Sequence, residues 1–146
     1  MGAPLTEDVH FTQRIEFPAK AENLALAEKL IDEVCKQYNV PEALYGNILI
    51  ALTEAVNNAI HHGNQLDPSK QVQLSYGVKD GKVTFLVCDE GPGFDHEHLP
   101  DPTDPQNIEK PHGRGVFLMR ALADSVEFTD NGASVSMTFS LTAPKE

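Results

Sequence analysis

Positive charge is scarce in this sequence, which carries 11 Lys and Arg residues against 22 Asp and Glu, for a formal net charge of -11. A surface of this sign repels both a nucleic-acid backbone and an anionic bilayer. We therefore expect no direct nucleic-acid partner and no membrane partner. Long apolar runs are also missing, and residues 1–10 show no positive segment followed by an apolar one, so we expect a cytoplasmic protein.

Cysteine is equally sparse. The two cysteines, Cys35 and Cys88, lie in apolar segments and lack the spacing of metal ligands. We expect reduced, buried thiols and no structural disulfide. A Walker-type Gly-Lys-Ser/Thr sequence and a dinucleotide fingerprint after the first strand are both absent, so any phosphate chemistry belongs to another nucleotide fold.

The length of 146 residues and the hydrophobic content of 40% suit one domain with a single core, which we place over residues 1–146. Apolar alternation predicts strands, and apolar residues three or four apart predict helices. The expected elements, in order, are a strand (9–17), two helices (24–38 and 41–63), two strands (72–78 and 83–87), a long loop (89–111), a helix (113–124) and two strands (126–128 and 135–141).

Turn chemistry connects these elements. Asp80-Gly81 joins the middle pair of strands as a hairpin, and Asn131-Gly132 links the last pair. Most strands show one polar and one apolar face, which predicts a two-layer α+β arrangement with helices on one side of a mainly antiparallel sheet.

Three polar residues on the second helix recur every four positions: Glu54, Asn58 and His62. They form a stripe at the border of the apolar face, where they would line the edge of a groove. A carboxylate and an amide oxygen one turn apart can share a magnesium site, or the amide can hold the ion while the carboxylate orients an attacking hydroxyl. The alternative is an ordinary solvated helix flank.

The segment Asp89-Glu-Gly-Pro-Gly93 directly follows a strand that we expect to be buried. Asp89 would be a fixed hydrogen-bond acceptor at the strand end, and the glycines would let the backbone approach a ligand closely. The alternative is a tight turn in which Asp89 is simply a turn former.

The segment His112-Gly-Arg-Gly115 places two glycines and a cation at the start of the next helix. Backbone N–H groups and the helix dipole favour a phosphate there, and Arg114 or Lys110 would add charge-assisted bonds. The alternative is a capped helix with a basic first turn. Because glycine costs about 1 kcal/mol against alanine inside a helix, the paired glycines favour an anion site.

Taken together, Glu54-Ala-Val-Asn-Asn58, Asp89-Glu-Gly-Pro-Gly93 and Gly113-Arg-Gly115 resemble the N box, G1 box and G2 box of the gyrase/Hsp90/histidine-kinase/MutL ATPase superfamily. Within that superfamily, the short length, the stretch from Thr53 to Gly63 and the segment Leu118–Leu122 are similar to the anti-sigma factor serine/threonine kinases. The resemblance extends from about residue 9 to residue 141.

This resemblance implies a Bergerat-type ATP-binding fold and a role for each matching residue. Asp89 would accept from the adenine amino group, Asn58 would coordinate Mg²⁺, and Glu54 would be the general base. Gly91, Gly93, Gly113 and Gly115 match backbone positions around adenine and the phosphates, and residues 94–111 match the ATP lid. Family members phosphorylate a serine on a small anti-sigma factor antagonist, and sequester a sigma factor when the antagonist is not available.

Two features of this sequence go beyond the family pattern. Arg114 separates the glycines where related proteins often have an apolar residue, so its side chain would reach either phosphate or a partner. His61 and His62 lie close to Glu54, where they would either tune its proton affinity or cap the helix end, and we favour the structural role.

The leading hypothesis is an ATP-dependent serine/threonine kinase that also binds a regulatory partner and forms a homodimer, as related proteins often do. The alternative is a non-catalytic module, in which ATP only organises the surface that captures a partner. A free-standing histidine-kinase catalytic domain is disfavoured, because the chain has no pair of phosphoacceptor helices and its lid region is short.

Overall fold

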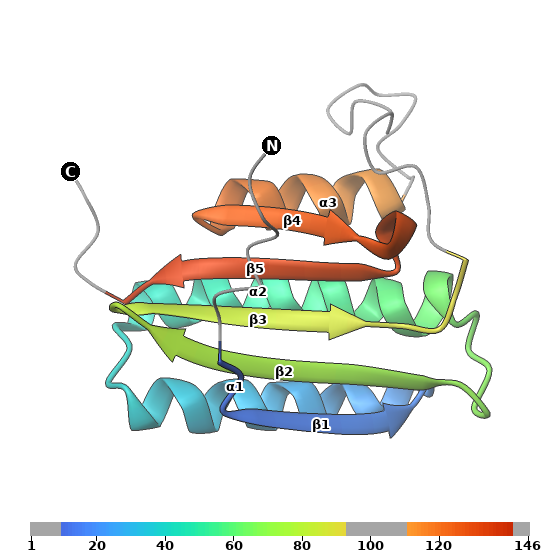
Figure 1. Cartoon of the computed structure of the whole chain (residues 1–146), viewed down its shortest axis with the longest axis horizontal. Coiled ribbons are helices and arrows are strands. Elements are labelled where there is room, and N and C mark those ends of the chain that lie inside the picture. The colour runs from blue at the N-terminus through green and yellow to red at the C-terminus, as the bar shows by residue number, and fades with distance from the viewer. Residues whose placement is uncertain (1–9, 93–110, 142–146) are drawn as a thin grey trace.

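The fold is an α+β sandwich in which the helices cover one face of an antiparallel five-stranded sheet (Figure 1). The computed structural model describes residues 10–92 and 111–141, and within them it leaves the side chains of residues 111–114 and 131 undescribed. The strands are β1 (Gln13–Pro18), β2 (Gln71–Lys79), β3 (Lys82–Cys88), β4 (Ser125–Thr129) and β5 (Ser134–Ser140), in the spatial order β1-β2-β3-β5-β4. The predicted fold class is confirmed.

Helix α1 (Leu24–Gln37), preceded by the short η2 (Ala21–Asn23), forms because its apolar residues recur at helical spacing. Its buried positions are Ala27, Leu30, Ile31, Val34 and Cys35. Asn39, two residues after the end of α1, has a positive φ of 51° that turns the chain away from the helix. This conformation lets the N–H of Val40 donate back to the carbonyl of Cys35. The end predicted before Pro41 is therefore confirmed.

Helix α2 (Glu42–Asn58) continues into a single π-helical turn, η3 (Ala59–Gly63), so the long second helix is confirmed and its last turn is wider than an α-helix. Asn64 closes this turn by donating its backbone N–H to the carbonyl of Ala59 at 2.8 Å. Such π turns occur often at functional sites.

The hairpin between β2 and β3 has the predicted turn. Asp80 and Gly81 both have positive φ, 53° and 73°, as a two-residue turn of the primed type requires. The last two strands are joined through η4 (Asp130–Gly132), which contains the predicted Asn131-Gly132 pair. Because these turns fix the register, the alternate residues Val83, Phe85 and Val87 of β3 all face the helices and are buried.

The starts of two elements differ from prediction by two residues or more. The first strand begins at Gln13 and not at Val9, although Thr12 still donates to the carbonyl of Tyr76 beside it. Helix α3 (Pro111–Leu122) begins two residues before Gly113, since proline is well suited to a first helical turn. Gly113 and Gly115 therefore lie inside the start of α3 and not before it.

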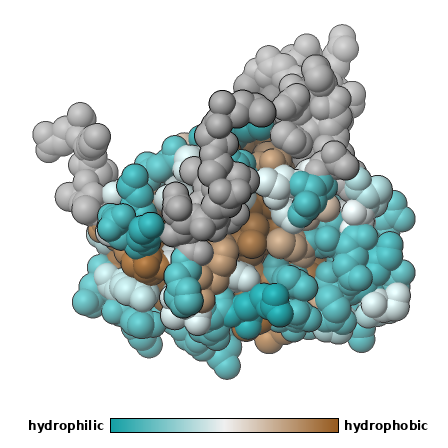
Figure 2. Space-filling view, viewed as in Figure 1, coloured by the Kyte–Doolittle hydropathy of each residue, from teal (hydrophilic) through white to brown (hydrophobic). Residues whose placement is uncertain are grey.

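One core fills the space between the sheet and the helices, with α2 packed between α1 and α3. The opposite sheet face is the one seen in Figure 2, where hydrophilic side chains surround smaller hydrophobic areas. Cys35 is buried and Cys88 half-buried, and both are free thiols. In the two described ranges, every helix is too short or too polar to cross a bilayer.

Candidate functional site

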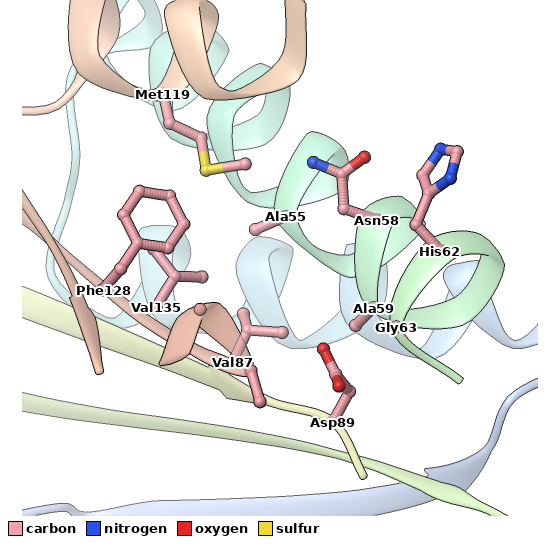
Figure 3. Close-up of a pocket in the computed structure, with 12 residues that line it drawn as sticks. Ala55, Asn58, Ala59, His62, Gly63, Val87, Asp89, Met119, Phe128 and Val135 are labelled. Carbon is pink, nitrogen blue, oxygen red and sulfur yellow. The ribbon is translucent and has the colours of Figure 1, made fainter. Parts of the chain in front are cut away.

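A pocket opens where the end of β3 faces the last turns of α2 and η3, with α3 and β4 on the other side (Figure 3). The predicted site residues Asn58 and Asp89 both line it. The remaining lining residues are Ala55, Ala59, His62, Gly63, Val87, Met119, Phe128, Gly132, Ala133 and Val135. Two motifs that are 31 residues apart in the sequence thus meet in one cavity.

Asp89 lies at the base of the pocket, where β3 ends. Its backbone N–H donates to the carbonyl of Ala133 at 2.9 Å, and its Oδ1 accepts from the N–H of Gly91 at 2.7 Å. Burial raises the pKa of the Asp89 carboxyl, while the Gly91 bond and the positive charge of Lys70 act in the opposite direction. One carboxylate oxygen is thereby fixed, and the group faces a cavity with few other polar atoms.

Glycines bring the backbone to within contact of Asp89. A Cβ on Gly63 would fall 2.6 Å from Oδ1 of Asp89, and a Cβ on Gly91 would fall 2.6 Å from the carbonyl carbon of Gly63. Both distances are far shorter than an ordinary contact, so a Cβ on Gly91 would collide with backbone, and a Cβ on Gly63 would displace the Asp89 carboxylate. The close backbone approach at Gly91 is to Gly63 within the chain, and the predicted approach of Gly91 to a ligand stays a prediction.

The other end of the site is formed by α2 and the start of α3. A Cβ on Gly115 would lie 2.9 Å from Nδ2 of Asn58 and 3.1 Å from Oε2 of Glu54. Glycine at this position therefore leaves room for an amide and a carboxylate side by side. The predicted stripe of Glu54, Asn58 and His62 is present on the helix, and Asn58 and His62 line the pocket while Glu54, one turn before Asn58, does not.

The side-chain amide of Asn58 lines the pocket, and its nitrogen lacks a hydrogen bond within the described part of the chain. Its Nδ2 is a buried polar atom without a hydrogen-bond partner among the described residues. A buried polar group left unpaired costs roughly 1–3 kcal/mol, which suggests that a ligand completes the site. Because the O and N ends of an amide are exchanged by a flip, the same side chain can present its oxygen to a cation.

The two histidines differ in position. His62 lines the pocket beside Asn58, as Figure 3 shows, whereas His61 is exposed. Burial, and then the charge of His61, lower the pKa of His62, which favours a neutral imidazole. His62 therefore belongs to the pocket wall, as predicted for the stripe that it shares with Asn58.

The wall between these two polar ends is apolar. Ala55, Val87, Met119 and Val135 contribute aliphatic surface, and Phe128 contributes an aromatic ring that the guanidinium of Arg120 covers at 5.6 Å from its centroid. A mostly apolar cleft with a few convergent polar groups is the usual form of a small-molecule site.

From the sequence alone, Asn64 had no predicted role in the site. This side chain is fully buried and bridges two backbone segments. The local sequence around Asn64 does not predict this bridge, because the two partners, Gln71 and Glu90, lie 7 and 26 residues further along the chain.

Several predicted residues fall outside the described part of the chain. Gly93, Lys110 and the proposed lid from residue 94 to 110 lie there, and only Pro111 of the lid segment is described, as the first residue of α3. Gly113 and Arg114 belong to the first turn of α3, but their side-chain environment is not described.

Comparison with known proteins agrees with this geometry. The family model of the histidine kinase-like ATPase domain matches residues 17–139, which includes every strand from β2 onward and all three long helices.

Curated relatives include serine-protein kinases named RsbW. The protein from Oceanobacillus iheyensis is 25% identical over 131 residues, covering 85% of this chain and 83% of the relative. The protein from Bacillus cereus is 27% identical over 131 residues, covering 85% of this chain and 81% of the relative.

A solved structure has the same fold. The crystal structure of the RsbU and RsbW domains of a Mycobacterium tuberculosis protein superposes with a TM-score of 0.66 at 18% identity. The match covers 90% of this chain and 32% of the solved chain, so the chain corresponds to about a third of that protein.

Proposed function

Because this chain belongs to the histidine kinase-like ATPase family, we propose that it is an ATP-dependent serine-protein kinase with an anti-sigma role. It would phosphorylate a serine on a small anti-sigma factor antagonist, and bind a sigma factor when the antagonist is unavailable to it. The observation that carries the proposal is that Glu54 and Asn58 both lie against Gly115, and that Asn58 lines the same pocket as Asp89.

The adenine would lie in the apolar part of the pocket. Asp89 is held by the Gly91 N–H through one oxygen, and its carboxylate is an acceptor for the amino group of adenine. The side chains of Val87, Met119 and Phe128 would cover the faces of the ring. Lys110, Gly113 and Arg114 remain our predicted contacts to the phosphates, and Gly93 our predicted contact near adenine.

The phosphate end would carry the chemistry. Glu54 accepts the proton of the seryl hydroxyl as that oxygen attacks the γ-phosphorus of ATP. The new O–P bond forms as the bond from the γ-phosphorus to the bridging oxygen of the β-phosphate breaks, and ADP leaves. Gly115 supports this role because any larger residue would displace both Glu54 and Asn58.

The residues present fit a magnesium ion. Asn58 supplies an amide whose hydrogen-bonding capacity is not met among the described residues, and Glu54 supplies carboxylate oxygens beside it, which together are the hard oxygen donors that Mg²⁺ prefers. When bound, the ion would neutralise charge on the β- and γ-phosphates. We assign Asn58 as its protein ligand, with Glu54 kept for proton transfer.

Phosphotransfer tests the proposal directly. The purified chain would be incubated with γ-labelled ATP and the small antagonist protein that co-purifies with it or is encoded beside it. Glu54→Gln removes the base but keeps the shape of the side chain, and Glu42→Gln is a matched control at the start of the same helix, where the residue is exposed.

We expect transfer by the wild type and by Glu42→Gln, and a loss of about 100-fold or more in Glu54→Gln, since general-base catalysis contributes roughly 10²–10⁴-fold. Equal transfer by all three proteins would refute the role of Glu54. ATP-dependent thermal stabilisation without any transfer would instead establish the non-catalytic binding module.

Three further features belong to the same proposal. We place the protein in the cytoplasm, with ATP as its nucleotide, and as a homodimer. Size-exclusion chromatography with light scattering checks the last point.

A further inference from the structure

Three backbone segments meet next to Asp89. They are the end of η3, the start of β2 and the turn that follows β3. Asn64 joins them. Its Nδ2 donates to the carbonyl of Gln71 at 2.9 Å, and its Oδ1 accepts from the N–H of Glu90 at 2.8 Å. The residue has 0% exposure, so both bonds are made away from water.

The turn after β3 depends on these bonds for its position. Glu90 follows Asp89 directly, and its carboxylate in turn accepts from the backbone N–H of Gln71. The next residue, Gly91, donates its N–H to Oδ1 of Asp89 and packs against the backbone of Gly63. Asn64 is therefore hydrogen-bonded to Glu90, which lies between Asp89 and Gly91 in the sequence. The N–H of Gly91 in turn holds the Asp89 carboxylate.

An amide is well suited to this position, because a single side chain supplies one donor and one acceptor at the same time. Removing it would leave the N–H of Glu90 and the carbonyl of Gln71 without this partner at a part-buried place. The turn would then shift toward other partners, and the Asp89 carboxylate would shift with it.

We infer that Asn64 is a positioning residue for purine selection: by holding the N–H of Glu90, it fixes the Asp89 carboxylate at the place where only a purine with a 6-amino group is accepted. This inference rests on the proposed adenine site. A 6-oxo purine presents an acceptor where adenine presents a donor, so a fixed carboxylate repels it. A carboxylate that is free to move tolerates it.

The test is the ratio of the Kd for Mg-ITP to the Kd for Mg-ATP, measured by calorimetry on the full chain. Wild type, Asn64→Ala and Asn64→Ser are compared, the serine variant leaving space for a water in place of the amide. Asn23→Ala is the matched control, since its Nδ2 also donates to a backbone carbonyl, that of Pro18, at 2.8 Å, and neither residue lines the pocket. Partial unfolding lowers the affinity for both nucleotides equally, so the ratio is insensitive to it.

We expect wild type and Asn23→Ala to prefer ATP by about tenfold or more, and both Asn64 variants to lose at least about two-thirds of that preference. In an Asp89→Ala background the preference should be small, and Asn64→Ala should change it no further, because the effect passes through Asp89.

An unchanged ratio in whichever Asn64 variant folds would overturn the inference while leaving the adenine site intact. An equal loss of selectivity in Asn23→Ala would also overturn it, because the effect would then be one of general destabilisation. Absence of ATP binding by the wild type would overturn the adenine site, and this inference with it.

Discussion

The carboxylate of Asp89 lies directly against the backbone of Gly63, at a separation that leaves no space for a Cβ on the glycine. Asp89 directly follows β3, and Gly63 is the last residue of η3, the turn that continues α2. Their contact is therefore where the sheet and this helix meet at the pocket. The obstruction that a side chain would create involves only the end of the Asp89 side chain, which can rotate away. Function is therefore more sensitive than stability at this position.

Gly63→Ala should weaken ATP binding by about tenfold or more while changing the melting temperature little. The added methyl would force the Asp89 carboxylate out of the position in which it accepts from Gly91. Calorimetry with Mg-ATP and a thermal melt give the two quantities. Gly46→Ala is the control, since nothing lies within 4 Å of a Cβ there, and it should stabilise α2 by about 0.5–1 kcal/mol with unchanged ATP affinity. A Gly63→Ala protein with wild-type affinity would contradict the contact.

Asp89→Asn should raise the melting temperature at pH 7.5 by about 2 °C or more, the size of shift that a modest stabilisation gives in a domain of this length. Burial raises the folded-state pKa of Asp89 above its unfolded value of 3.8, so the folded protein binds this proton more tightly. The associated stability is complete below pH 3.8 and is lost as the pH rises through the raised pKa. Partial exposure of the carboxyl keeps the effect small.

The difference between Asp89→Asn and wild type should accordingly shrink as the pH is lowered from 7.5 toward 5. Melts in one buffer series at constant ionic strength measure it. A gap that widens at lower pH would mean that the folded protein lowers the pKa of Asp89, contrary to the effect of burial.

Adenosine affinity should fall with falling pH in the wild type. Protonation through the raised pKa of Asp89 removes the acceptor for the adenine amino group. Adenosine is the suitable probe because it has no phosphates that titrate in the same range. Asp89→Asn should bind adenosine weakly at every pH, and a wild-type affinity that does not fall at any pH at which the protein stays folded would contradict Asp89 as the acceptor.

Gly115→Ala should reduce ATP affinity by about tenfold and phosphotransfer by more, with adenosine affinity preserved. The new Cβ would lie within 2.9 Å of Asn58 and 3.1 Å of Glu54, at the phosphate end of the pocket and away from Asp89. Comparing the two ligands by calorimetry separates the ends of the site. An equal loss for ATP and adenosine would show that the substitution disturbs the whole pocket.

Much of this architecture was accessible from local pattern. Asp80 and Gly81 form a turn that their own conformational preferences favour, and the helical period alone places Glu54, Asn58 and His62 on one stripe. The order of the three motifs was enough to predict the family, which the match over residues 17–139 confirms.

Other features were beyond such reasoning. Helix α3 starts at Pro111 and strand β1 starts only at Gln13. Such boundaries depend on where hydrogen-bond partners begin and end, and the period of apolar residues does not reveal this. The individual site assignments for Glu54, Asn58 and Asp89 remain predictions that the experiments above address.

The sequence by itself determined the helices, the hairpins, the sidedness of the sheet and the identity of the polar groups, because each follows from residues within a few positions of one another. Only the tertiary structure decided that Gly63 touches Asp89, that Gly115 makes room for Glu54 and Asn58, and that Asn64 bonds to Glu90. Those contacts join segments from 26 to 61 residues apart, and their geometry is set by the close packing of α2 against the sheet and α3, which no local preference encodes.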